Sequence, residues 1–187
     1  LNKQVHEVIH GEDAPYFIPN TDMVALDQIV GEGDEGTFAN VENVIKVLNV
    51  ESSEIDLGMM LGYPSNKFKF NIFDLQVENE DGDTKDIRVI DPNQAAKFQM
   101  FMSKLADRCR GKEGSQNMMS WGDWWVIKNT YVTLRHPYVT TVHKSQGHTY
   151  GVVYVNVADI YSNRDASEYN RLLYVAFTRS KYVCLNV

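Results

Sequence analysis

Three stretches in the first half of the chain have the hydrophobic and polar pattern of β-strands. They are rich in β-branched and aromatic side chains, partly in alternation with polar ones, and cover residues 23–30, 41–50 and 68–77. Asp81-Gly82, a common two-residue hairpin signal, follows the third stretch, and residues 87–90 resume a strand pattern. Short strands separated by turn signals predict a small barrel or a twisted antiparallel sheet.

Two segments have the periodicity of helices instead. Residues 2–10 form the first, which Gly11 ends. Its apolar face consists of Val5, Val8 and Ile9. The second is predicted over residues 92–110, with Asp91 as its cap and Pro92 in its first turn. Its buried stripe recurs at steps of three and four residues and consists of Phe98, Phe101, Met102, Leu105 and Cys109.

The last third of the chain changes to an α/β pattern. Residues 151–157 are almost continuously apolar, which is typical of a strand buried on both faces of a parallel sheet. Further strands are predicted over residues 138–142 and 182–187, and a helix over residues 168–177. The order strand, strand, helix, strand, with short connections, is that of an α/β domain.

Composition and length are those of an ordinary globular protein. The 187 residues are 43% hydrophobic and 23% charged, which suits one domain or one domain with a small insert. No apolar run approaches the ~18 residues that span a bilayer, so no membrane partner is expected. Two cysteines exclude a disulfide scaffold and a CxxC zinc site, and the five histidines share no ligand spacing, so no metal site is expected.

Charge is divided unevenly along the chain. The net charge of -7 argues against a nucleic-acid binder when taken as a whole. Residues 1–114, however, hold 11 Lys and Arg against 21 Asp and Glu, whereas residues 115–187 hold 7 against 4. Any contact with a polyanion is therefore expected in the second part.

The sharpest chemical signal is the run Thr-Val-His-Lys-Ser-Gln-Gly at residues 141–147. It follows a predicted strand, and the ligands of α/β sheets gather at the carboxyl ends of strands. Its hydroxyl and amide groups can donate to phosphate oxygens, Lys144 adds positive charge, and His143 can donate a hydrogen bond or stack. Taken alone, the run is equally compatible with a solvated turn between two strands.

A second run, from Arg171 to Lys181, places an apolar helix before Thr-Arg-Ser-Lys. A rigid helix can direct the guanidinium of Arg179 at charge that develops on a phosphoryl group, the arginine-finger arrangement. Arginine suits this task because its planar fork binds phosphate oxygens in a bidentate way. Taken alone, the run is equally compatible with a basic C-terminal cap on an ordinary helix.

Together the two runs resemble a known family. Residues 141–147, followed by Gly-Val-Val-Tyr-Val, resemble motif V of superfamily 1 helicases, and Leu-Leu-Tyr-Val-Ala-Phe-Thr-Arg-Ser-Lys resembles their motif VI. The form of the first run is similar to that of the RecD-like branch, which moves 5′ to 3′. The aromatic stretch from Trp121 to Trp125 is similar to one in the Dda-type bacteriophage helicases.

The resemblance implies an α/β fold, in which a partial RecA-like second domain of the P-loop NTPase class carries an inserted β-rich, SH3-like barrel and a helix. Residues 1–19 and 115–187 would form the RecA-like domain, and residues 20–114 the insert. The implied function is that of the C-terminal part of an ATP-dependent DNA helicase, which couples ATP hydrolysis to translocation on single-stranded DNA. The alternative is a non-catalytic nucleic-acid-binding module that retains the helicase fold.

The resemblance also implies roles for single residues. Single-stranded DNA would contact Thr141, His143, Lys144 and Ser145. Arg179 would reach the γ-phosphate as the catalytic arginine finger and would share nucleotide binding with Gly147. Gln146 and Thr178 would support the catalytic arginine. Many relatives have Glu two residues after the motif V glycine, where it meets the ribose, but Thr149 stands here instead.

Two motifs of such enzymes have no match in this chain. Neither G-x-x-x-x-G-K-[ST] nor an acidic Mg²⁺-binding strand motif occurs in it. ATP and Mg²⁺ would therefore be bound mainly by an N-terminal RecA-like domain outside this chain, and we expect the chain alone to hold no cofactor and to hydrolyse no ATP. The expected partners are that domain and single-stranded DNA, in a protein that is monomeric and cytoplasmic in a bacterial or phage-infected cell.

Two further patterns have weaker functional interpretations. Gly31 to Gly36 matches G-x-G-x-x-G, but the three carboxylates inside it would oppose a pyrophosphate, so an acidic loop is predicted instead. Trp121, Trp124 and Trp125 could stack on bases. Their mixed spacing and apolar neighbours favour packing in a core or between domains.

Overall fold

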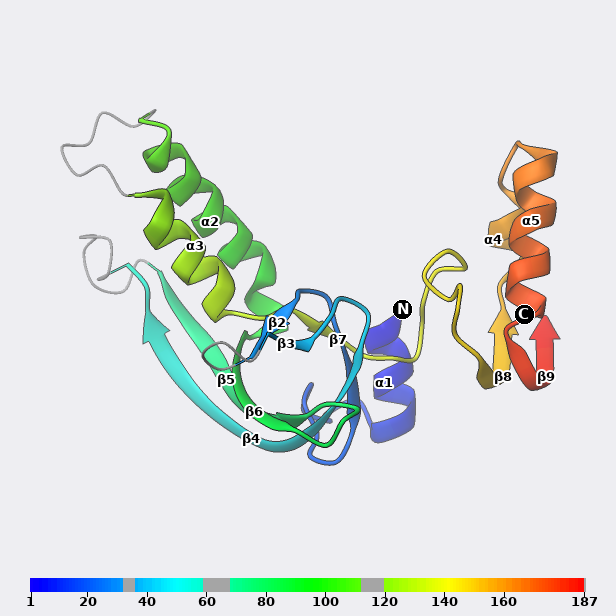
Figure 1. The fold of residues 1–187 in the computed structure, drawn as a ribbon, viewed down its shortest axis with the longest axis horizontal. Helices are drawn as coiled ribbons and strands as arrows, with labels where there is room; N and C mark the ends of the chain where they lie inside the picture. The colour runs from blue at the N-terminus through cyan, green and yellow to red at the C-terminus, as the bar shows by residue number, and fades with distance from the viewer. Residues whose placement is uncertain (32–35, 59–67, 112–119, 187) are drawn as a thin grey trace. The chain divides into compact units, whose positions relative to one another are not determined.

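The computed structural model describes residues 1–31, 36–58, 68–111 and 120–186, which fall into two compact units, Leu1–Pro137 and Tyr138–Val187 (Figure 1). The first unit contains α1 (Asn2–His10), β1 (Asp22–Ala25), β2 (Ile29–Val30), β3 (Thr37–Ala39), β4 (Val44–Asp56), β5 (Lys69–Glu78), β6 (Thr84–Ile90), the 3₁₀ turn η2 (Pro92–Gln94), α2 (Ala95–Cys109), α3 (Trp121–Thr130) and β7 (Leu134–Arg135). The second contains β8 (Tyr150–Val155), α4 (Val157–Tyr161), α5 (Ala166–Phe177) and β9 (Ser180–Asn186). Residues 32–35 of the acidic loop predicted between Gly31 and Gly36 lie outside the described residues.

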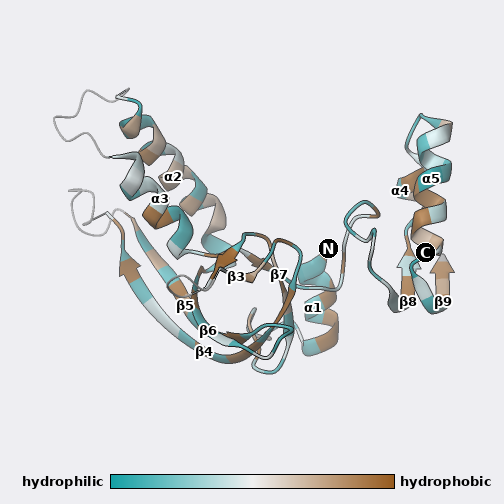
Figure 2. Cartoon of the chain, in the orientation of Figure 1, coloured by the Kyte–Doolittle hydropathy of each residue, from teal (hydrophilic) through white to brown (hydrophobic). Residues whose placement is uncertain are grey.

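The first unit has the predicted antiparallel sheet, in the order β6-β5-β4-β1-β7. β4 carries both hydrophobic and hydrophilic residues (Figure 2), and exposed and buried positions alternate over residues 44–47. Val47 of β4 lies opposite Val77 of β5. Ile45, Val47, Leu75 and Val77 are buried together in one core. This alternation fixes the register of the strands, because a one-residue slip would turn the core side chains toward solvent.

The hairpin predicted at Asp81-Gly82 joins β5 to β6. The Asn79 side chain accepts hydrogen bonds from the amides of Asp81 and Asp83, at 3.1 and 2.8 Å. Gly82 has a φ of 87°, a left-handed conformation in which glycine has no side chain to clash. Residues 80–84 at this turn are exposed to solvent.

A short segment after α3 closes the sheet into a barrel. Tyr131 pairs with Arg88 of β6, and the next amide, of Val132, donates to the Arg88 carbonyl at 2.8 Å. A few residues further on, β7 pairs with β1. Residues 131–135 thus join the two ends of the sheet, which leaves no long unpaired edge there.

The carboxylate of Asp27 holds the end of α3 against this barrel. It accepts hydrogen bonds from the Lys128 ammonium at 2.8 Å and from the Thr133 amide at 3.0 Å. Burial alone would raise the pKa of Asp27, but the hydrogen bonds from Lys128 and Thr133 outweigh it and lower that pKa. The ionised carboxylate thereby fixes the direction in which the chain leaves α3 and enters residues 131–135.

α2 packs on the far ends of β4 and β5 and forms a second core with α3. Asp91 caps η2 by accepting the Asn93 amide, as predicted, and the α-helix begins at Ala95, three residues after the predicted start at Pro92. Phe101, Met102 and Leu105 of the predicted stripe are buried, whereas Phe98 and Cys109 are partly exposed. The second core also contains Leu57, Phe68, Phe70, Ile72, Ile90, Ile127 and Tyr131.

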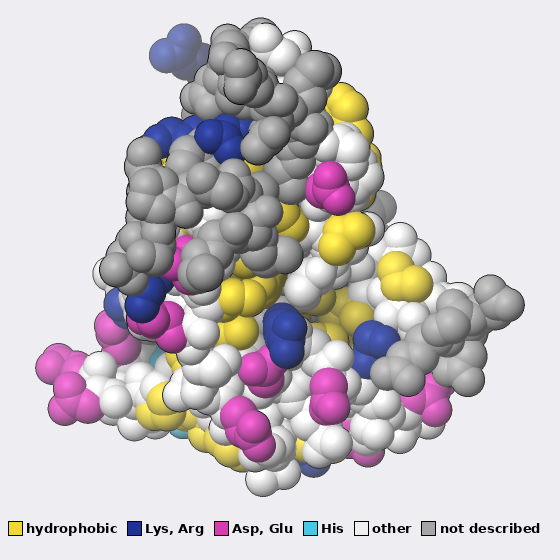
Figure 3. All heavy atoms as spheres, turned by 90° about the vertical axis from the view of Figure 1, so that its left-hand side faces the viewer, with side chains coloured by type: hydrophobic (Ala, Val, Ile, Leu, Met, Phe, Trp, Pro, Cys, Tyr) yellow, Lys and Arg dark blue, Asp and Glu magenta, His cyan; other side chains and the backbone are white. Residues whose placement is uncertain are grey.

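The sequence pattern did not predict α3. A capping box starts this helix, in which the Ser120 and Asp123 side chains each accept the other residue's amide. Its apolar residues lie on all sides, so no amphipathic period marks it. Trp124 packs on the second core and its indole donates to the Met102 carbonyl at 3.2 Å, as packing in a core requires, but Trp121 and Trp125 are 44% and 55% exposed. Figure 3 shows the side of the molecule that lies at the left of Figure 1, where hydrophobic and charged side chains are interspersed.

α1 forms where it was predicted, but its apolar face is not the buried one. Val8 is 86% exposed, whereas His6 is buried. The His6 ring stacks on the ring of His136 with centroids 4.1 Å apart, and Tyr16 lies 4.3 Å from the same ring. Aromatic stacking, rather than a hydrophobic stripe, therefore holds α1 to the barrel unit.

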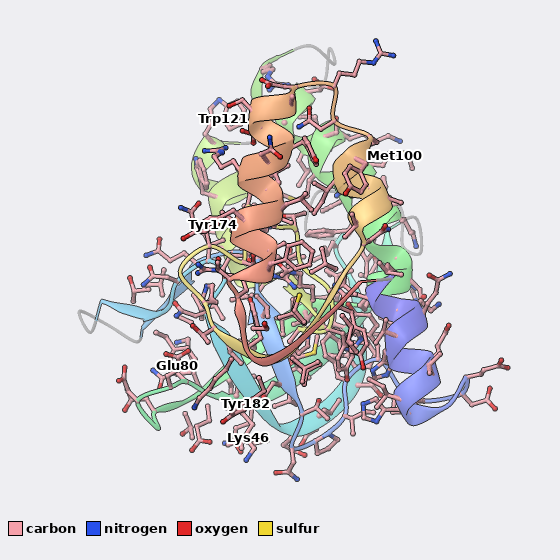
Figure 4. All side chains as sticks on the ribbon, turned by 90° about the vertical axis from the view of Figure 1, so that its right-hand side faces the viewer. Lys46, Glu80, Met100, Trp121, Tyr174 and Tyr182 are labelled. Atoms are coloured by element: carbon pink, nitrogen blue, oxygen red, sulfur yellow. The ribbon has the colours of Figure 1, made fainter. Side chains whose placement is uncertain are left out.

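The second unit is a parallel strand pair with two helices. β8 and β9 pair in parallel, and α4 and α5 pack with them around Val155, Val157, Ile160 and Ala176. The predicted burial of residues 151–157 on both faces is wrong, because Tyr154 is 69% exposed and residue 157 begins α4. Tyr174 of α5 and Tyr182 of β9, labelled in Figure 4, are also largely exposed.

The strand predicted over residues 138–142 is wrong as well. These residues form no strand, and residues 142–147 that follow are turns. The reason is local hydrogen bonding, since the Ser145 amide donates to the Thr141 carbonyl at 3.0 Å instead of the chain pairing with a neighbouring strand. The predicted helix and last strand of this unit are present as α5 and β9.

Residues 1–19 and 120–137 lie in the barrel unit, through the stacked histidines of α1 and the packing of α3 on α2. The division of the chain into 1–19 with 115–187 and 20–114 stays a prediction. No helix among the described residues is both long enough and apolar enough to cross a membrane.

The buried histidine stack predicts acid sensitivity. Burial, and then the charges of His6 and His10, lower the pKa of His136 from 6.5 to about 4. Protonation then favours the unfolded chain, so stability is unaffected above pH 6.5 and falls by about 3 kcal/mol between pH 6.5 and 4. Urea unfolding at a series of pH values checks this, with His136→Phe retaining the ring but not its titration.

The variant should show a smaller loss of stability between pH 6.5 and 4 than the unmodified protein. His148→Phe, at an exposed histidine of the second unit, is the matched control and should leave the pH dependence unchanged. An equal loss in His136→Phe and the unmodified protein would contradict the account.

Candidate functional site

The run at residues 141–147 is a compact series of turns at the start of the second unit. The Lys144 amide donates to the Thr141 hydroxyl at 3.4 Å, and the Gln146 amide donates to the His143 carbonyl at 3.3 Å. Gly147 has a φ of 91°, so a side chain at this position would be strained. These bonds fold the run back on itself and leave most of its side chains directed outward.

Three of the four residues predicted to bind DNA lie at the surface of this turn. Thr141, His143 and Lys144 are exposed, and so is Gln146. Ser145 is different, because its side chain is buried and its hydroxyl donates to the Val142 carbonyl at 2.7 Å. The geometry gives Ser145 a role in holding the turn together, whereas the other three can reach a ligand directly.

His143 is held by a carboxylate from α5. Its Nε2 lies 3.3 Å from Oε1 of Glu168, and the same oxygen accepts a hydrogen bond from Nη2 of Arg171 at 2.8 Å. The hydrogen bond from Arg171 is the main cause that lowers the pKa of Glu168, with a smaller contribution from His143. An ionised carboxylate therefore faces the imidazole.

Arg179 follows the C-terminal end of α5 and is directed by hydrogen bonds to backbone carbonyls. Its Nε donates to the Val175 carbonyl at 3.2 Å, and its Nη1 donates to the His148 carbonyl at 3.3 Å. Its Nη2 donates to the Thr178 hydroxyl at 3.3 Å, and that hydroxyl donates to the Tyr174 carbonyl at 2.8 Å. The Thr178 hydroxyl is thus in contact with the guanidinium, and its predicted role in catalysis stays a prediction.

The structure brings the two predicted runs together. His148 follows directly after the first run, and Arg179 belongs to the second, so the hydrogen bond between them connects both. The Tyr150 amide also donates to the Arg179 carbonyl at 2.9 Å, which fixes the backbone at the same point. In the described part of the chain, the Arg179 side chain donates to Val175, His148 and Thr178 and makes no hydrogen bond with Gln146.

Glu168 is the site residue that sequence reasoning missed. It was assigned only to the start of a helix, where acidic side chains are common. The available signal is its position three residues before Arg171 on one helix face, the spacing of an ion pair. Its contact with His143 joins positions 25 apart in the sequence, which no local pattern predicts. In the described part of the chain, no three His, Cys, Asp or Glu side chains are grouped to hold a metal ion.

Comparison with known protein families gives one match for each of the two units. The family described as the Dda helicase SH3 domain matches residues 23–136, and the family described as the UvrD-like helicase C-terminal domain matches residues 136–184. No match was found among curated proteins.

The fold is therefore an SH3-like barrel joined to an α/β helicase C-terminal domain. The chain belongs to the Dda/UvrD-like superfamily 1 helicases and carries their C-terminal domains. The SH3-like domain that the family resemblance implies is thereby confirmed.

The buried hydroxyl of Ser145 predicts a stability effect. Ser145→Ala removes its donor to the Val142 carbonyl and should lower the free energy of unfolding of the second unit by about 1 kcal/mol. Ser162→Ala is a matched control, because its hydroxyl also donates to a carbonyl three residues earlier but is exposed, and it should cost under about 0.5 kcal/mol. Urea unfolding of both variants checks this. Equal losses of unfolding free energy in the two variants would contradict the stabilising role of the buried Ser145 hydroxyl.

Proposed function

We propose that this chain is the C-terminal part of an ATP-dependent DNA helicase, which couples ATP hydrolysis to translocation along single-stranded DNA in the 5′ to 3′ direction. The turn at residues 141–147 contacts the DNA strand through Thr141, His143 and Lys144. Arg179 binds the γ-phosphate of ATP and stabilises the charge that develops during its transfer to water. The two family matches, in this order along the chain, support the helicase assignment.

The observation that carries the proposal is the hydrogen bond from Arg179 Nη1 to the His148 carbonyl. It connects the arginine proposed for the nucleotide with the turn proposed for the strand. If Arg179 moves when the nucleotide is hydrolysed, this hydrogen bond moves the backbone at His148, next to the turn. Coupling of hydrolysis to movement along a strand needs a contact of this kind.

The chain's residues fit one side of a nucleotide site. The hydrogen bonds of Arg179 use one N–H on each of its three nitrogens, which leaves a second N–H on Nη1 and on Nη2. Two such donors can bind phosphate oxygens as a fork. The N-terminal RecA-like domain of the helicase would hold ATP and Mg²⁺ and supply the phosphate-cradling loop, while Arg179 would orient and neutralise the terminal phosphate.

Arg179→Ala tests this function in the helicase that contains the chain. A phosphoryl-transfer arginine contributes about 10³- to 10⁵-fold to the rate, so ATP turnover with saturating single-stranded DNA should fall by orders of magnitude. Arg179→Lys should recover little of the loss, because an ammonium lacks the planar fork. Steady-state ATP hydrolysis measures both variants.

The matched control is Arg164→Ala, at an exposed arginine before α5, which should keep turnover within about twofold. Thermal melting accompanies the assay, since Arg179 also donates to the Val175 and His148 carbonyls and its loss should lower the melting temperature slightly. A folded Arg179→Ala enzyme with near wild-type turnover would refute the proposed role.

The proposed DNA contact is tested by the double change of His143 and Lys144 to Ala. Both side chains are exposed on the turn, so their loss should weaken stimulation of ATP hydrolysis by single-stranded DNA more than it lowers the rate without DNA. Lys46→Ala, at an exposed lysine of β4, is the control and should leave the stimulation unchanged. Undiminished stimulation in the double variant would show that the turn is only a connector.

A further inference from the structure

Glu168 occupies a position that links both proposed contacts of the site. It lies in the first turn of α5, where the Asp165 side chain accepts its amide at 3.3 Å and so fixes its backbone. Its carboxylate contacts His143 at this end of the helix, and Arg179 donates to the His148 carbonyl just beyond the other end. The ten helical residues from Glu168 to Phe177, about 15 Å of helix, therefore lie between the contact with His143 and the contact with His148, the residue that follows the turn.

The chemistry of the contact fixes the state of the imidazole. An ionised carboxylate only accepts hydrogen bonds, so Nε2 of His143 must carry a proton in order to donate to Glu168. The ring is thereby held in one orientation, with Nδ1 directed away from the carboxylate. A histidine on an exposed turn would otherwise sample several rotamers, and holding one reduces the entropy that is lost on binding.

Arg171 offsets the repulsion that the Glu168 carboxylate would exert on the phosphates of a DNA strand. Its guanidinium donates to the same oxygen of Glu168 at 2.8 Å, so the carboxylate and guanidinium charges offset one another. The exposed fractions of the Arg171 and Glu168 side chains are 64% and 28%, so the carboxylate is the more sheltered of the two. The pair therefore adds no net negative charge where the DNA strand would lie.

We propose that Glu168 is a positioning residue for DNA binding, which acts by orienting His143 toward the strand. The inference rests on the proposed function, since it assumes that the turn at residues 141–147 contacts single-stranded DNA. It assigns to the start of α5 a task in DNA binding, in addition to the proposed task of Arg179 at the nucleotide. The residue that orients His143 then lies at the start of α5, and the residue proposed for the nucleotide lies just beyond its end.

A double-mutant cycle in the helicase that contains this chain tests the proposal. The variants are Glu168→Gln, His143→Ala and the two combined, and the readout is the Kd for a fluorescein-labelled oligothymidine strand, measured by anisotropy. Glu168→Gln should weaken binding about two- to fivefold, the range expected for one exposed charged contact. Because Glu168 acts through His143, the combined variant should bind no more weakly than His143→Ala alone.

ATP hydrolysis supplies a second readout that a merely structural role would not produce. Glu168→Gln should raise the DNA concentration for half-maximal stimulation by the same factor, rather than lower the maximal rate. Glu80→Gln, at the exposed hairpin tip between β5 and β6, is the matched control and should change neither quantity.

The outcomes separate this inference from the proposed function. Unchanged DNA affinity in Glu168→Gln, or penalties that multiply in the combined variant, would overturn the positioning role. The absence of DNA-stimulated ATP hydrolysis in the wild-type helicase would overturn the proposed function instead. Thermal melting of each variant shows whether a loss of binding reflects unfolding. The proposal expects Glu168→Gln to stay folded, because the cap of α5 at Asp165 is left intact. A loss of binding that comes from unfolding would therefore count against it.

Discussion

The second unit depends on the attachment of one helix at both of its ends. At the start of α5, Glu168 contacts His143, and just beyond its end Arg179 donates to the carbonyl of His148. The turn between these two points has no strand to support it, so its shape follows from its internal hydrogen bonds and from α5. A displacement at either end of a rigid helix is transmitted to the other, which is the property that the proposed coupling of ATP hydrolysis to DNA binding needs.

The barrel unit depends on a different constraint, the closure of its sheet by residues 131–135. This segment pairs with β6 through Tyr131 and with β1 through β7, and Asp27 fixes its entry. The segment leads directly into the stacked ring of His136, on which α1 packs. Barrel closure and the attachment of α1 are thus consecutive along the chain.

Local patterns predicted the barrel strands, the hairpin at Asp81-Gly82, α2 and α5, because alternation, turn residues and caps act within a few residues. They failed where the deciding contact is distant or absent. α3 has no amphipathic period, and the burial of His6 depends on His136. Residues 138–142 read as a strand, but local turns took their hydrogen bonds. The site runs were identified by resemblance, whereas Glu168 and the inward hydroxyl of Ser145 required three-dimensional contacts.

The central claim, that this chain serves an ATP-driven motor on single-stranded DNA, is tested most directly by strand separation. The assay compares duplexes that carry either a 5′ or a 3′ single-stranded tail, incubated with the helicase that contains this chain, with and without ATP. The account predicts ATP-dependent separation of the 5′-tailed duplex and little separation of the 3′-tailed one. Separation of neither duplex, or equal separation without ATP, would contradict it.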